Sequence, residues 1–180
     1  MRSVFTFFFG FIAGMLFLIL MLWSHGSLQP VHAHAADCRQ ADAIYADRAG
    51  AYELRFQPIG SQTAAASNRF TIGVANTTVI MDGYVMSSED PERSNGLLMF
   101  RCPEGDVTGA DLDACTVWQG MVYGTDAKGD FANLPGEEAG AAERVLFAGL
   151  GPAIRGSSVW GKGKATVAPW DLLTFKGCAK

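Results

Sequence analysis

Residues 52–58 read Tyr-Glu-Leu-Arg-Phe-Gln-Pro, a stretch in which large apolar side chains alternate with charged or polar ones. This period of two is typical of a β-strand that buries one face, and Pro58 ends the pattern. A second alternation covers residues 116–123, where Trp118 and Val122 fall on the same face. Both stretches predict strands of a sheet with one face in a core.

Further short apolar stretches, separated by turn residues at intervals of about 8–12 residues, predict more strands. They are residues 70–74, 78–81, 97–102, 131–134, 165–167 and 172–175. Asn76-Thr77 and Asp82-Gly83 each offer a hairpin turn near the first two stretches, and the sequence does not choose between them. The pattern predicts a mainly β fold, either an antiparallel β sandwich or a small barrel.

One or two short helices are expected beside the strands. Residues 137–149 begin with acids and end at Gly149, which is typical of a helix, and residues 36–50 carry a weaker helical spacing. Residues 87–96 are expected to form a charged loop, because Pro91 and Gly96 interrupt both regular periods.

The glycine-rich residues 156–163 resemble a phosphate-binding loop up to the last position of that motif. There Gly163 lacks the hydroxyl that would hold Mg²⁺. We therefore interpret the stretch as a glycine-rich turn.

The N-terminal segment predicts export. Residues 4–23 are apolar and uncharged, Arg2 precedes them, and Ala33-His34-Ala35 supplies the small-residue pattern of a cut before Ala36. The apolar run is also about the ~20 residues that a bilayer-spanning helix needs, so an uncleaved membrane anchor stays open.

These observations divide the chain into residues 1–35, a signal peptide or membrane anchor, and residues 36–180, a single exported β-rich domain. We expect that domain in the periplasm or the extracellular medium. With an uncleaved anchor it would be held at the inner membrane, outside the cytoplasm.

Charge and histidine content exclude several classes of function. The chain has 14 Lys+Arg and 18 Asp+Glu, a net charge of −4 that argues against a nucleic-acid-binding surface. All three histidines precede the predicted cut. An imidazole-free domain has no Ser-His-Asp or Cys-His arrangement and no histidine zinc site.

The exported part carries four cysteines, and an even number in an exported chain predicts disulfides with three possible connectivities. We favour Cys102–Cys115, which closes a short loop rich in Pro and Gly, together with Cys38–Cys178, which ties the two ends of the domain. No C-x-x-C pair is present, so a thiolate metal site is not expected.

Tryptophans and acids are the remaining candidate site residues. Trp118, Trp160 and Trp170 are large amphipathic rings; we take Trp160 and Trp118 as candidate ligand-binding residues and expect Trp160, among small neighbours, to be exposed. Four acids in the predicted Cys102–Cys115 loop suggest calcium, but their spacing differs from a calcium loop and favours a solvated acidic loop. They are Glu104, Asp106, Asp111 and Asp113. We expect no metal and no cofactor.

The function predicted from these features is a non-enzymatic envelope module that binds a protein, a glycan or a small ligand. In size, compartment and disulfide use it is similar to the small periplasmic β-barrel inhibitors of lysozyme, although none of their motifs is present. Two alternatives stay open: a histidine-free hydrolase using paired carboxylates or a Ser/Lys pair such as Ser158 with Lys162 or Lys164, and a membrane-tethered structural subunit.

Overall fold

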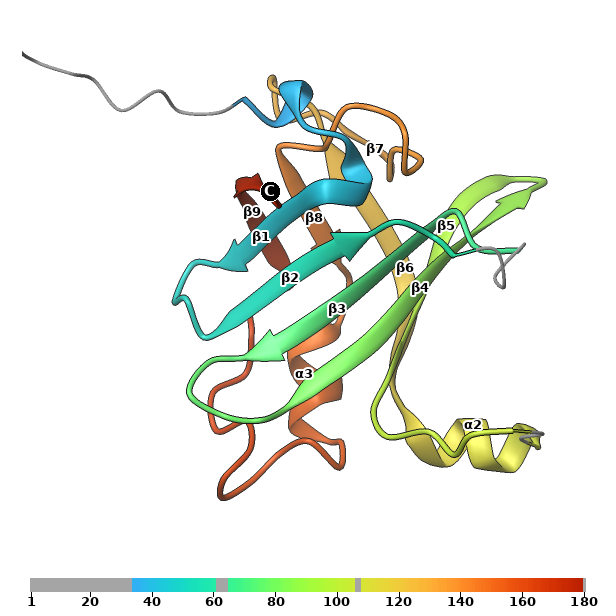
Figure 1. Ribbon diagram of the computed structural model, residues 1–180, viewed down its shortest axis with the longest axis vertical. Coiled ribbons are helices and arrows are strands. Elements are labelled where there is room, and N and C mark those ends of the chain that lie inside the picture. The colour runs from blue at the N-terminus through green and yellow to red at the C-terminus, as the bar shows by residue number, and fades with distance from the viewer. Residues whose placement is uncertain (1–33, 61–64, 106–107, 180) are drawn as a thin grey trace, which may run out of the picture. The chain divides into compact units, whose positions relative to one another are not determined.

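The computed structural model describes residues 34–60, 65–105 and 108–179, and in this part of the chain antiparallel strands close a barrel (Figure 1). Around the barrel the strands run in the order β1, β2, β3, β4, β5, β6, β8 and β9, with β9 paired back to β1 and the short β7 attached to β6. The strands are β1 (Ala43–Asp47), β2 (Tyr52–Gln57), β3 (Asn68–Val74), β4 (Ile80–Glu89), β5 (Glu92–Met99), β6 (Thr116–Thr125), β7 (Phe131–Asn133), β8 (Arg144–Phe147) and β9 (Leu172–Cys178).

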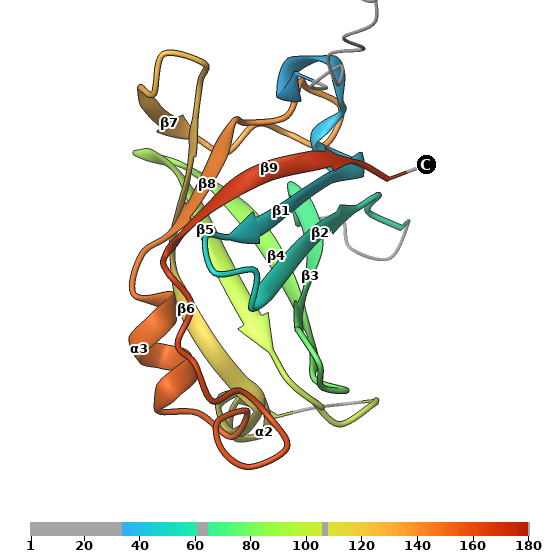
Figure 2. The same cartoon turned by 90° about the vertical axis from the view of Figure 1, so that its left-hand side faces the viewer.

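Short helices lie at the barrel ends and against its outer wall. Two 3-10 turns, η1 (Ala35–Asp37) and η2 (Gln40–Asp42), precede β1, while α2 (Gly109–Cys115) joins β5 to β6 and α3 (Leu150–Arg155) follows β8. Figure 2 shows α3 outside the barrel, beside β6. The small-barrel alternative for the fold is therefore confirmed, with short helices as expected.

Side chains fill the interior of the barrel. The Phe147 ring lies 5.3 Å from both the Phe70 and the Trp118 ring, centroid to centroid. Opposite Phe70, Gly83 leaves room for the ring, and a Cβ atom there would collide with it. Eight strands enclose a space just wide enough for side chains, so this interior is a packed core. Its fully buried inward residues include Tyr45, Tyr52, Leu54, Phe70, Ile72, Met81, Leu98, Phe147 and Leu173.

One end of the barrel is covered by the connection between β7 and β8. The backbone N–H of Ala142 donates to Gln40 Oε1 at 3.0 Å, and its carbonyl accepts from the Tyr45 hydroxyl at 2.9 Å. The Ala142 methyl also lies over Gly124 of β6. These contacts close the barrel interior at this end with buried groups.

Two disulfides are present, in the pairing that the sequence favoured. Cys38–Cys178 joins the segment before β1 to the end of β9, and its Cα atoms are 5.9 Å apart. Cys102–Cys115 closes the connection that contains α2, with Cα atoms 5.1 Å apart.

Two helix predictions are wrong. Residues 144–147 form β8, because they pair with β6 on one side and with β9 on the other. The stretch 36–50 forms the two 3-10 turns and then β1, which pairs with β2 and β9. In both places the pairing with distant strands overrides the local helical pattern.

One loop prediction is wrong, one open choice of turn is decided, and one predicted strand is nearly absent. Residues 87–96 continue the β4–β5 hairpin, with Ser87 opposite Ser94. The turn between β3 and β4 lies at Asn76-Thr77, whereas Asp82-Gly83 lies within β4. The predicted strand at 165–167 contains only an isolated bridge from Ala165 to Trp160.

The predicted export helix, residues 4–23, lies outside the described residues. In the part of the chain that the structure describes, no helix has the length and apolarity needed to span a membrane.

Candidate functional site

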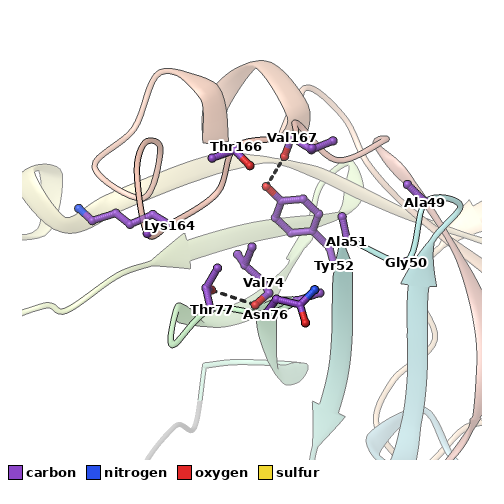
Figure 3. Close-up of a pocket in the computed structure, with 12 residues that line it drawn as sticks. Ala49, Gly50, Ala51, Tyr52, Val74, Asn76, Thr77, Lys164, Thr166 and Val167 are labelled. Atoms are coloured by element: carbon purple, nitrogen blue, oxygen red, sulfur yellow. Dashed lines mark hydrogen bonds between the residues drawn. The ribbon is translucent and has the colours of Figure 1, made fainter.

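Three connections surround a hollow of about 470 Å³ at the loop end of the barrel (Figure 3). The β1–β2 turn contributes residues 49–51, the β3–β4 turn contributes residues 75–77, and the loop before β9 contributes Gly163, Lys164, Thr166 and Val167. Several of these residues are Ala or Gly, so the hollow is bounded largely by backbone and small side chains.

Tyr52 joins the barrel wall to the loop before β9. Its side chain is 1% exposed, and its hydroxyl donates a hydrogen bond to the Val167 carbonyl at 2.6 Å (Figure 3). The buried Asp47 carboxylate accepts from the N–H of Tyr52 at 2.9 Å and from that of Ala49 at 3.4 Å. These bonds fix the β1–β2 turn and hold the loop over it.

Burial raises the pKa of Tyr52 to about 12, and the negative charge of Asp47 adds to the rise. The unfolded chain releases this proton near pH 10, so the stabilisation is complete below pH 10 and is lost as pH rises toward 12. We expect the free energy of unfolding to fall by about 1.4 kcal/mol at pH 11 from this residue alone. Urea denaturation of the wild type and Tyr52→Phe at pH 9 and pH 11 measures it. The variant should lose less stability over this interval, and an equal loss in both proteins would contradict the assignment.

The β3–β4 turn presents an exposed amide at the rim. Asn76 adopts a left-handed backbone conformation with φ of 58°, which asparagine tolerates better than most residues. Thr77 Oγ1 donates to the Val74 carbonyl at 2.9 Å and accepts from the Val79 N–H at 3.1 Å. The turn is thus held from within, and Asn76 lies outside it.

Cationic and aromatic side chains border the hollow. Lys164 lies at the rim with its side chain extending away from Tyr52 and Thr77 (Figure 3). Its Nζ donates to the Ser158 carbonyl at 2.7 Å. The Arg48 guanidinium lies 4.0 Å from the centroid of the Trp170 ring, close enough for a cation–π interaction. Val167, which lines the hollow, is 55% exposed, and Trp170, three residues further along the same loop, is 53% exposed.

The charge of this end differs from that of the whole chain. Residues 148–171, which include α3 and the loop before β9, contain three Lys or Arg (Arg155, Lys162 and Lys164) but a single acid, Asp171. The Asp171 carboxylate accepts from the N–H groups of Gly149 at 2.7 Å and Gly151 at 3.0 Å, so it serves the start of α3. The acidic helix α2 lies at the same end but on the other side of it (Figure 1).

The cations of this end have no acidic partner in the described residues. Within the described residues, ion pairs join Arg39 to Asp42 and to Glu138, and Arg55 to Glu53. None includes Arg48, Arg155, Lys162 or Lys164. An acidic protein therefore carries a locally basic surface beside an exposed indole.

The structure places the predicted tryptophans differently from one another. Trp118 is 4% exposed, lies in the core and donates its indole N–H to the Ala148 carbonyl at 3.0 Å, so it presents no binding surface. Trp160 is partly buried against the core, with the Arg155 guanidinium 5.8 Å from its ring. The expectation that Trp160 is the exposed ring is wrong. Trp170 is the more exposed ring, and its place between Pro169 and Asp171 was the sequence signal available for it.

One acid of the loop around α2, Asp111, serves to cap the start of that helix. The Asp111 carboxylate accepts from the N–H and the hydroxyl of Thr108, and these bonds lower its pKa. Asp106 lies outside the described residues. Among the residues that are described, no group of three or more His, Cys, Asp or Glu side chains is placed to hold a metal ion.

A second hollow, of about 460 Å³, lies near the β6–β7 turn and brings two acids together, Asp126 and Glu143. The Asp126 carboxylate accepts from the N–H of Asp130 at 3.0 Å and from that of Lys128 at 2.8 Å. The bond from Asp130 is the main cause that lowers the pKa of Asp126. A general acid requires the opposite shift, so Asp126 is suited to stabilising the turn.

Comparison with protein families, curated proteins and solved structures gives no match to this chain. The functional assignment therefore depends on the geometry and charge of the residues themselves.

Proposed function

We propose that the protein is an exported, disulfide-stabilised β-barrel that binds an anionic glycan, without catalysis, at the hollow between the β1–β2 turn, the β3–β4 turn and the loop before β9. The observation that carries the proposal is the exposed Trp170 ring beside Arg48, which has no acidic partner among the described residues. The paired cysteines support export, because disulfides persist in oxidising compartments.

Binding at the loops follows from the packing of the barrel. The interior is occupied by aromatic rings, and the end near β7 is covered by the hydrogen-bonded segment around Ala142. Loops held on a rigid scaffold are a common place for binding residues. The loop end offers both a hollow and exposed apolar groups.

The charge of the site favours an anion. Lys164 lines the hollow, Arg48 directly precedes the lining residue Ala49, and the carboxylate of the neighbouring Asp47 is buried and bonded to backbone N–H groups. A cluster of one sign of charge attracts a ligand of the other sign and raises its rate of association. A carboxylate on the ligand would give these cations an acidic partner, which the described residues do not supply.

The shape and the aromatic edge favour a sugar. A hollow of about 470 Å³ lies within the range typical of small-ligand sites. The exposed Trp170 ring suits the apolar face of a pyranose, while the neighbouring hydroxyl, amide and backbone groups suit its hydroxyls. An acidic glycan combines the carboxylate with the stacking face.

Calorimetric titration with an oligogalacturonate, and with a maltooligosaccharide of the same length as the neutral control, tests the proposal. We expect the acidic oligosaccharide to bind more tightly, and added salt to weaken its binding. Trp170→Ala and Lys164→Gln should each weaken it about tenfold, because each removes a contact of about 1.4 kcal/mol.

Matched controls lie near β7, away from this loop (Figure 1). Phe131 is 59% exposed and Lys128 is exposed, so Phe131→Ala and Lys128→Gln remove the same kinds of group elsewhere. These two variants should bind as the wild type does. Equal effects in both pairs, or tight binding of poly-glutamate with none of the acidic sugar, would contradict an acidic-glycan site.

A further inference from the structure

Ala35 belongs to the folded domain, although it lies before the cut predicted from the sequence. Its side chain is 0% exposed and is part of the main hydrophobic core. Its carbonyl accepts from the N–H of Cys38 at 3.0 Å, and the carbonyl of the exposed His34 accepts from the N–H of Asp37 at 3.1 Å. The turn η1 that leads to Cys38 thus begins at His34.

A cut before Ala36 would damage this arrangement. It would remove a buried methyl group from the core and leave the N–H of Cys38 without its acceptor, directly beside the Cys38–Cys178 disulfide. It would also place a charged amine on Ala36, whose backbone packs closely against Gly140. Each of these changes destabilises the mature domain.

We propose that the export signal peptidase instead cleaves before His34, which rests on the export proposed above. The peptidase adds water across the Ala33–His34 amide, which leaves a carboxylate on Ala33 and an amine on His34. Val31 and Ala33 supply the small aliphatic residues at positions three and one before this bond. The cut lies at an exposed residue and shortens the segment between the apolar run and the cut by two residues.

This cut changes the composition of the mature protein. The mature chain keeps one histidine, His34, as its first residue, where a cut before Ala36 would leave none. The core keeps Ala35, and the complete turn η1 remains in front of Cys38.

The test expresses the full chain in a Gram-negative host and measures the intact mass of the protein released by osmotic shock. We expect the mass of residues 34–180. Release of residues 36–180 would overturn the inference while leaving export standing, and a full-length chain kept in the membrane would also overturn it. Full-length protein in the cytoplasm would overturn both the inference and the proposed export.

Two reciprocal variants make the result independent of folding, because the mass is read on newly exported, pulse-labelled chain. Ala33→Leu should abolish the 34–180 species, since leucine blocks the small-residue position, whereas Ala35→Leu should still yield a chain that begins at His34. Loss of cleavage in Ala35→Leu would place the cut before Ala36, because Ala35 is the last residue before that bond. Loss of glycan binding has no effect on these masses, so the two proposals fail separately.

Discussion

Replacing Trp118 with alanine is expected to lower the free energy of unfolding by about 3–5 kcal/mol, the range found when a large aromatic side chain is removed from a core. The ring packs edge-on to Phe147, and Gly96 and Gly120 lie directly beneath it. Its removal leaves a cavity that these neighbours do not fill, and it leaves the Ala148 carbonyl without its indole donor. Urea denaturation followed by far-UV circular dichroism measures the loss.

Two control variants separate the structural role of Trp118 from a binding role. Trp118→Phe should cost less, because a smaller ring still occupies most of the space. Trp170→Ala should change stability by less than about 0.5 kcal/mol, as is usual for an exposed residue. Equal stability losses in Trp118→Ala and Trp170→Ala would contradict the filled barrel that the account assumes.

Removing the Cys38–Cys178 disulfide with paired serines is expected to cost about 4–5 kcal/mol, because the bond closes a loop of 140 residues in the unfolded chain. Removing Cys102–Cys115, which are separated by 13 residues, should cost about 3 kcal/mol on the same chain-entropy account. Denaturation midpoints of the two double variants against the wild type give the order.

The two disulfides also differ in what they hold. Cys38–Cys178 ties the start of the fold to β9, which lies between β1 and β8 in the barrel. Cys102–Cys115 holds a connection outside the barrel, so its loss should loosen α2 and leave the barrel folded. A larger stability loss from the short-range pair would contradict this division.

The strands of the fold were predictable where one face is buried. In β2, apolar Tyr52, Leu54 and Phe56 alternate with exposed Glu53 and Arg55, and the structure shows the same alternation of buried and exposed residues. The cysteine pairing followed from the same outline, because the ends of a single closed domain must come together.

Helix α3 was missed for a physical reason. It is only six residues long, which is too short for a helical period to appear in the sequence. Pro152 in its first turn was the available signal, since proline is tolerated there. For residues 144–147, by contrast, a helix was predicted where the structure has a strand. Nothing in the local sequence reveals that β6 and β9 flank these residues.

The candidate site was only partly accessible to sequence reasoning. Tryptophans were the correct residue type, but burial decides their role: Trp118 and Trp170 differ by where the barrel places them. The basic end depends on the turn at Arg48 meeting the loop at Lys164. More than 100 residues separate these two segments, and only the closed barrel brings them together.

The most direct test of the account is a map of amide chemical shifts in the ¹⁵N-labelled protein titrated with oligogalacturonate. We expect the perturbed amides to cluster in residues 48–51, 75–77 and 163–171, while those of the inward-facing core and the β7 end stay unchanged. Perturbations centred on the β7 end, or none at ligand concentrations that saturate a millimolar site, would contradict it.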